Sequence, residues 1–362
     1  MDIIIEFFHQ AVESEASDIH LKVGQPPIYR LEGHLYKADA PPITRDQMLE
    51  LMNEILTPGL KESFDKNQEA DFAWTMTDKI RFRANLFSSS GEPTLSLRYV
   101  KNAVHTFETL NLPAQLAKIA MSRRGIVMMA GTTGSGKSTT LGAMLNYIND
   151  REFRRIITIE DPIEYIFKDK ESVISQREIG FDTDSFQTGL RAAMRQDPDI
   201  IMVGEIRDRN SVETAITAAE TGHLIFSTVH AENSVQGVSR VLDMFSADER
   251  PQIRLAMSHT LRAMICQRLI PGVNGRVRPA CEILSNNALV RKLIQEESMD
   301  KLAIAIETGK EDGMISFNQA LYQMVKEGVV DQETAMRFAS NPQALEMNLR
   351  GVFLDAGHRI VG

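Results

Sequence analysis

The residues with the clearest chemical potential form one glycine-rich segment in the middle of the chain. The run GTTGSGKS at 131–138 fits the spacing G-x-x-x-x-G-K-[ST], whose backbone N–H groups surround phosphates. Lys137 is expected to reach the β- and γ-phosphates of a nucleotide, and the Ser138 hydroxyl is expected to hold Mg²⁺. The candidate nucleotide contacts are Gly131, Thr132, Thr133, Gly134, Ser135, Gly136, Lys137, Ser138 and Thr139.

Acidic residues follow two apolar runs further along the chain. IITI leads into Glu160 and Asp161, with Glu164 one turn on, and IIMVG leads into Glu205. In open α/β sheets, ligands bind outside the carboxyl ends of the strands. Glu205 is the preferred general base and could also steady the magnesium shell, together with Glu160 and Asp161. Helix capping is the alternative role for all four acids, Glu164 included.

Two histidines bracket the apolar run LIFSTV. His223 and His230 are seven residues apart, which in a strand separates them by about 23 Å and excludes a shared metal ion. In a strand parallel to its neighbours, only the C-terminal end faces the nucleotide. His230 is therefore expected to sense the γ-phosphate. His223 is expected to be structural or interfacial, with a nucleotide role as the alternative.

The elements that must position these residues are visible in the hydrophobic pattern. The apolar run at 125–130 precedes the glycine segment, and the helix-like TTLGAMLNYI follows it. The short runs GIVMMA, IITI, IIMV and LIFSTV alternate with helical patterns, which is typical of a buried parallel sheet. The pattern predicts a nucleotide-binding α/β core.

The first hundred residues predict a smaller mixed α/β module. An amphipathic helix opens the chain, 17–23 alternates like a half-buried strand, and TRDQ at 44–47 fits a helix capping box. Two further strands follow at 80–86 and 95–100, which predicts a twisted sheet with helices on one face. Arg81 and Arg83 share one strand face, so both could point at a single anion; a solvated polar face is the alternative.

Length and composition restrict the class of protein. A chain of 362 residues predicts two or three domains, and 43% hydrophobic with 25% charged residues excludes disordered and collagen-like classes. The net charge of −9 disfavours nucleic-acid binding. The two cysteines cannot form a four-cysteine zinc site. No apolar run reaches the roughly 20 residues that span a bilayer, so we expect a cytoplasmic protein without membrane insertion.

Four motifs in order indicate a family. GTTGSGKS, TIEDPIEY, DIIMVGEIRD and AETGHLIFSTVHA closely resemble the Walker A, Asp box, Walker B and His box of the type II/type IV secretion ATPase superfamily. Within it, the sequence resembles the PilT/PilU group of pilus retraction ATPases over essentially its whole length. The resemblance implies a PAS-like N-terminal α+β domain at 1–103, a hinge at 104–115, a RecA-like P-loop core at 116–275 and a mainly helical region at 276–362.

The resemblance also implies how the protein works. It implies a homohexamer that binds ATP and Mg²⁺ at subunit boundaries, with Arg81, Arg83 and Arg98 of the first domain completing the site. ATP hydrolysis would change the angle between domains and move a platform protein of the inner membrane at the pilus base. Docking at the inner face of that membrane, and cooperation with a paralogous pilus ATPase, are further expectations.

Several alternatives stay open. The stretch LVRKLIQE at 289–296 departs from the AIRNLIRE motif of PilT-type motors, so the chain is either the main motor or an accessory PilU-like paralogue. An assembly or secretion ATPase of the same superfamily is disfavoured by the missing cysteine pairs. A DNA translocase would need a basic channel, and a regulator without turnover would not need both Lys137 and Glu205.

Overall fold

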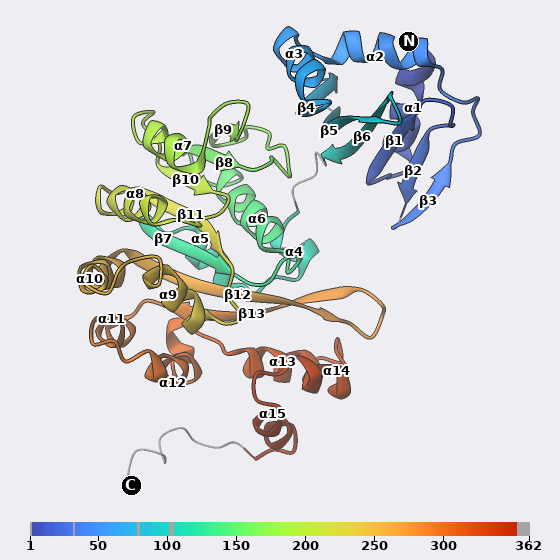
Figure 1. Cartoon of the computed structure of the whole chain (residues 1–362). Coiled ribbons are helices and arrows are strands. Elements are labelled where there is room, and N and C mark those ends of the chain that lie inside the picture. The colour runs from blue at the N-terminus through green and yellow to red at the C-terminus, as the bar shows by residue number, and fades with distance from the viewer. Residues whose placement is uncertain (1, 32, 78–79, 101–104, 353–362) are drawn as a thin grey trace. The chain divides into compact units, whose positions relative to one another are not determined.

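The chain folds into two units, which are described separately (Figure 1). The computed structural model describes residues 2–31, 33–77, 80–100 and 105–352. The first unit comprises 1–103 together with the short segment 162–166, and the second comprises 104–161 and 167–362. The segment 162–166 holds Glu164, so this residue belongs to a different unit from the rest of its motif.

The first unit is built on one antiparallel sheet with the strand order β3-β2-β1-β6-β5-β4. Alternation places Ile19, Phe82 and Leu97 on the face that forms the core with the helices, as the sequence predicts. The expected capping box begins α2, where Thr44 accepts from the Gln47 N–H and the Gln47 side chain accepts from the Thr44 N–H. The elements are α1 (Asp2–Glu13), β1 (Asp18–Lys22), β2 (Ile28–Leu31), β3 (His34–Lys37), α2 (Arg45–Ile55), α3 (Pro58–Asn67), β4 (Glu69–Thr77), β5 (Ile80–Ser89) and β6 (Glu92–Val100).

The second unit contains a sheet with the order β13-β12-β7-β11-β10-β8-β9. Every neighbouring pair is parallel except β12 with β13. Its strands are β7 (Gly125–Ala130), β8 (Arg155–Glu160), β9 (Val173–Glu178), β10 (Ile200–Val203), β11 (Leu224–Val229), β12 (Leu261–Pro271) and β13 (Val277–Ser285).

Helices cover both faces of this sheet, which explains the continuous apolar runs. In β7, Ile126 and Met128 pack into one core, while Val127 and Met129 pack into the other. The helices are α4 (Phe107–Leu110), α5 (Gln115–Ala120), α6 (Lys137–Asn149), α7 (Phe186–Ala193), α8 (Arg209–Glu220), α9 (Ser234–Leu242), α10 (Arg250–Thr260), α11 (Ala288–Gln295), α12 (Leu302–Thr308), α13 (Phe317–Lys326), α14 (Gln332–Phe338) and α15 (Pro342–Leu349), with 3₁₀ turns at Met299–Lys301 and Lys310–Asp312.

The end of the core differs from the sequence-based boundary at 275/276. That boundary falls in the turn between β12 and β13, whose backbones pair from Ala263 with Ser285 to Pro271 with Val277. The region at 276–362 therefore begins with a strand of the core sheet and becomes helical only from α11 onward. Residue 104 at the start of the expected hinge lies outside the described residues, and α4 occupies part of the rest of the hinge.

Among the residues described, no helix has the length and apolar character needed to cross a membrane.

Candidate nucleotide site

The glycine segment forms a tight loop between β7 and α6, as its flanking patterns predict. Three of its glycines have positive φ, namely 152° at Gly131, 77° at Gly134 and 83° at Gly136. A Cβ at Gly131 would overlap Oγ of Ser135 and lie 2.8 Å from the backbone oxygen of Gln267. The loop therefore requires glycine, and its backbone N–H groups and the N-terminus of α6 are suited to bind phosphates.

Lys137, the first residue of α6, lies folded over this loop. Its Nζ donates to the backbone oxygens of Gly131 at 2.9 Å and Thr132 at 3.0 Å. The ammonium group is thus held at the mouth of the loop by neutral acceptors, which an anionic phosphate can replace. The buried hydroxyl of Ser135 has no hydrogen-bond partner among the described residues. These features fit the phosphates of a bound nucleotide.

Gln267 of β12 supports the glycine loop, although no sequence pattern indicates this role. Its side chain is buried; Nε2 donates to the backbone oxygen of Ser135 at 2.8 Å, and Oε1 accepts from the Thr140 hydroxyl at 2.8 Å. One amide therefore joins the loop, α6 and β12. The partners lie more than 120 residues apart in the chain, so no local pattern indicates the contact.

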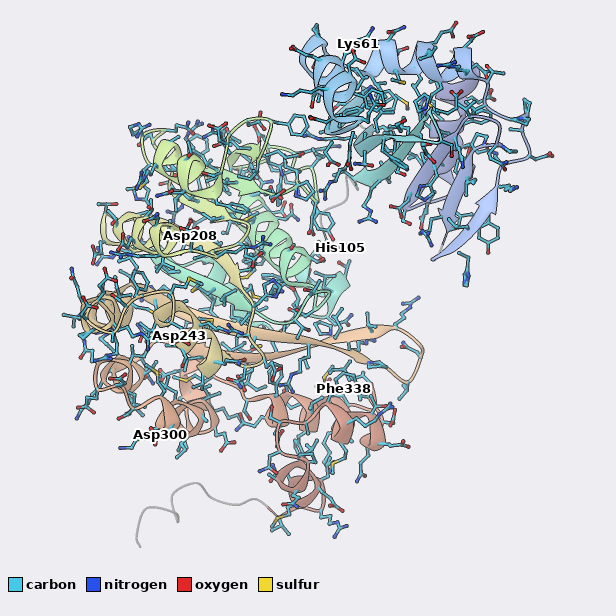
Figure 2. All side chains as sticks on the ribbon, viewed as in Figure 1. Lys61, His105, Asp208, Asp243, Asp300 and Phe338 are labelled. Carbon is cyan, nitrogen blue, oxygen red and sulfur yellow. The ribbon has the colours of Figure 1, made fainter. Side chains whose placement is uncertain are left out.

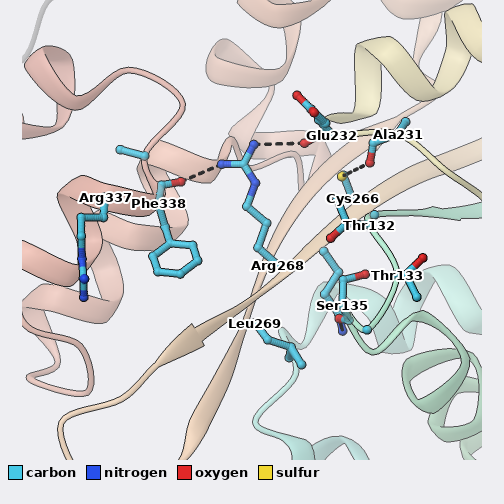
Figure 3. Close-up of a pocket in the computed structure, with 14 residues that line it drawn as sticks. Thr132, Thr133, Ser135, Ala231, Glu232, Cys266, Arg268, Leu269, Arg337 and Phe338 are labelled. Atoms are coloured by element: carbon cyan, nitrogen blue, oxygen red, sulfur yellow. Dashed lines mark hydrogen bonds between the residues drawn. The ribbon is translucent and has the colours of Figure 1, made fainter.

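A pocket of about 410 Å³ opens beside the loop (Figure 3). Arg268 crosses it, donating to the backbone oxygens of Phe338 at 2.7 Å and Glu232 at 3.0 Å, and its guanidinium lies 3.9 Å from the Phe317 ring centroid. The remaining wall comes from the loop, the strand that holds Cys266, and residues 337–339 at the end of α14. The end of α14 therefore lines the pocket beside the loop, which the sequence did not indicate.

Glu205 lies just beyond the end of β10, at the same edge of the sheet as the glycine loop. Its Oε2 is 2.6 Å from a terminal nitrogen of Arg207, and its Oε1 is 3.2 Å from Nε2 of His230. The hydrogen bond and charge of Glu205 raise the pKa of Arg207. Asp208, which is labelled in Figure 2, follows in the turn before α8. It caps this helix by accepting from the Ser211 N–H at 3.0 Å.

Thr228 ties the end of β11 to this turn, because its hydroxyl donates to the backbone oxygen of Gly204 at 2.8 Å. Glu205, Arg207 and His230 thus lie together at this edge of the sheet. His223 lies at the other end of β11, where Nδ1 is 2.9 Å from the backbone oxygen of Ala218. This position fits the structural role expected for His223.

The acidic residues at the end of β8 and after it lie in different surroundings. Glu160 is buried, and its Oε1 accepts from the Thr158 hydroxyl at 2.7 Å and from Nε2 of Gln176 at 3.0 Å. Asp161 is exposed, and Glu164 is exposed within the first unit. No cluster of three or more histidine, cysteine or acidic side chains suited to a metal ion occurs in the part of the chain described. Magnesium commonly binds through few protein groups and substrate phosphates, so Ser138 and one or two carboxylates would suffice.

The three arginines expected to complete the site lie in the first unit. Arg81 and Arg83 share one face of β5, and Arg98 lies directly opposite Arg83 on β6. Nε of Arg98 donates to Oδ1 of Asp18 at 2.8 Å. The side chains thus form a basic surface on the polar face of the sheet; their part in nucleotide chemistry stays a prediction.

Comparison with known proteins gives similarity over nearly the whole chain. The model of the type II/IV secretion system protein family matches residues 1–347. The type IV pilus retraction ATPase PilT of Pseudomonas aeruginosa is 36% identical over 340 residues, which are 94% of this chain and 99% of PilT. The type IV pilus ATPase PilU of the same organism is 36% identical over 349 residues, which are 96% of this chain and 91% of PilU.

A solved structure of a related protein shows the same similarity at the level of the fold. The crystal structure of the pilus retraction motor PilT with bound ADP matches with a TM-score of 0.87 and 38% identity, over 95% of this chain and 98% of that one. The match confirms the expected α/β fold, in which an N-terminal domain precedes a RecA-like P-loop core. It also supports nucleotide binding at the loop.

Proposed function

The chain belongs to the type II/IV secretion system protein family, and from this membership we propose that it is a motor whose ATP hydrolysis drives type IV pilus retraction. Its whole-length similarity to two relatives named as ATPases makes it an ATP hydrolase. The assignment of the hydrolytic step to Glu205 depends on one observation. Glu205 lies at the edge of the sheet where the glycine loop is, and Arg207 and His230 contact its two carboxylate oxygens.

The residues of this chain then have distinct tasks. Backbone N–H groups at 131–136 bind the phosphates, and Lys137 turns from the carbonyls of Gly131 and Thr132 to the β- and γ-phosphates. The Ser138 hydroxyl would hold Mg²⁺, and the bound ion would neutralise charge on those phosphates. Glu205 orients and polarises the attacking water, and His230 senses the γ-phosphate through its contact with Glu205. Thr132, Thr133, Gly134, Ser135, Gly136 and Thr139 complete the nucleotide contacts.

We assign supporting roles to the remaining acids and to the arginines. Glu160 and Asp161 would help to hold Mg²⁺. Glu164 would take part in catalysis from the segment 162–166, which belongs to the first unit. Negative charge develops at the γ-phosphate during phosphoryl transfer, so the site needs positive charge close to it. Arg81, Arg83 and Arg98 supply this charge within a homohexamer, across subunit boundaries.

The proposal extends to domains, partners and location. The first domain at 1–103 changes its angle to the RecA-like core, starting at 116, about the hinge at 104–115. Passing this change around the ring moves an inner-membrane platform protein at the pilus base, with the motor docked on the cytoplasmic side. A paralogous pilus ATPase is a further partner. The equal identity to PilT and PilU favours neither a main nor an accessory motor.

Hydrolysis is tested by replacing Glu205 while keeping its size. Glu205→Gln removes the basic carboxylate, and we expect turnover in a phosphate-release assay to fall by about 10² or more, because general bases contribute about 10² to 10⁴. ADP binding stays intact, since the loop is unchanged. Glu213→Gln is the matched control, because Glu213 pairs with Arg209 on the surface of α8 and should leave turnover unchanged. Undiminished turnover in Glu205→Gln would remove the assignment.

A further inference from the structure

We propose that the second unit carries another anion-binding pocket, which takes a small molecule bearing two or more phosphates. The pocket lies at the opposite edge of the sheet from the glycine loop, where β7 and β12 begin. It measures about 390 Å³. Its lining includes three arginines, Arg124 just before β7, Arg262 on β12 and Arg291 on α11, together with Glu220 and His259.

The three guanidinium groups make few contacts within the fold. Across the ranges that the structure describes, Arg124, Arg262 and Arg291 form no ion pair. The Nε of Arg291 is buried and has no hydrogen-bond partner there. Arg262 forms a single side-chain hydrogen bond, from Nε to the backbone oxygen of Arg124 at 3.0 Å. Each guanidinium has five N–H donors, so most of these donors remain available to a ligand.

Helix capping is the main structural alternative, because α8 and α10 end at this pocket and arginines often bind the last carbonyls of a helix. Other side chains already do this. The Thr221 hydroxyl donates to the backbone oxygens of Thr217 and Ala218, each at 3.0 Å. Asn286 Nδ2 donates to the backbone oxygens of Ser258 at 2.8 Å and Leu261 at 2.7 Å. The arginines are therefore not required to cap either helix.

Phosphate is the anion that this arrangement fits best. Planar guanidinium groups bind phosphate oxygens through two parallel hydrogen bonds. Three arginines against the single carboxylate of Glu220 give an excess positive charge for an anion of at least two charges. The volume is close to that of the nucleotide pocket, which allows a ligand of nucleotide size. None of the lining residues is lysine, and only one is glycine, so the pocket lacks the phosphate loop and is suited to binding without hydrolysis.

Pyrophosphate is the probe for this pocket, titrated calorimetrically into the full chain saturated with ADP. We expect one further binding event per chain, which persists in Lys137→Ala because that substitution affects only the glycine loop. The double variant Arg124→Gln/Arg262→Gln, and separately Arg291→Gln, should weaken pyrophosphate binding by about tenfold or more while ADP binding is kept. Arg123→Gln is the matched control, because Arg123 is the exposed neighbour of Arg124 and lies outside the lining.

Three results would each overturn the proposal. The first is absence of pyrophosphate binding once ADP occupies the loop. The second is loss of that binding in Lys137→Ala, which would place it at the loop. The third is equal weakening by Arg123→Gln and by the pocket variants, which would indicate general surface charge. Because no readout depends on ATP turnover, failure here is distinguishable from failure of the proposed motor function.

Discussion

Glu205 follows Gly204, a position with little room for a side chain. Gly204 occupies the place where Walker B elements usually have aspartate, and a Cβ there would lie 3.3 Å from the Phe186 ring and 3.4 Å from the backbone oxygen of Ile159. A side chain at position 204 would therefore require the Phe186 ring to shift slightly. The carboxylate at this strand end lies one residue later, at Glu205, where Arg207 and His230 contact it.

The reactivity of Cys266 tests how deeply its thiol is buried beside the glycine loop. The thiol lines the pocket, but burial raises its pKa to about 12. The protonated form therefore dominates until the pH approaches 12, and at about pH 8 the thiolate fraction is on the order of 10⁻⁴. Iodoacetamide at about pH 8 should leave the native protein unmodified and should label both cysteines in guanidinium chloride. Labelling of Cys266 in the native protein, measured by mass spectrometry, would contradict this burial.

Among the elements, β12 is the one whose side chain holds the glycine loop. Gln267→Leu keeps the size of the side chain and leaves the Ser135 oxygen and the Thr140 hydroxyl without their partner. We expect the free energy of unfolding in urea to fall by about 1 to 3 kcal/mol, and ADP binding to weaken. Gln252→Leu on the exposed side of α10 is the control. An unchanged unfolding midpoint and ADP affinity for Gln267→Leu would show that the amide does not support the loop.

Element order could be predicted from the sequence wherever the signal is local. The glycine loop between apolar β7 and α6, and the capping box at Thr44, depend on neighbouring residues and are found where expected. The sequence does not indicate β13, because its first residues include Arg278 and Pro279 and Glu282 interrupts its apolar run. Gln267 and Arg268 could not be identified, since their contacts join residues about 35 to 130 positions apart.

In the proposed hexamer, arginines of one subunit complete the nucleotide site of its neighbour. Arg83→Gln and Lys137→Ala should each abolish most turnover, because the first lacks charge for the neighbour's nucleotide and the second lacks the loop ammonium. Mixing the two proteins should restore part of the turnover, since some boundaries then combine an intact Arg83 with an intact Lys137. Arg45→Gln, an exposed first-unit arginine paired with Glu92, is the control and should be fully active. Mixtures no more active than either parent would contradict completion between subunits.

The central claim is that hydrolysis at Glu205 powers pilus retraction. The most direct measurement places Glu205→Gln in the chromosomal gene of the source cells and scores surface pili and twitching, with Glu213→Gln as the control strain. We expect Glu205→Gln cells to carry excess pili and to lose twitching, while control cells behave as the parent does. Cells that lose their pili, or that retain normal pilus numbers and twitching, would contradict it.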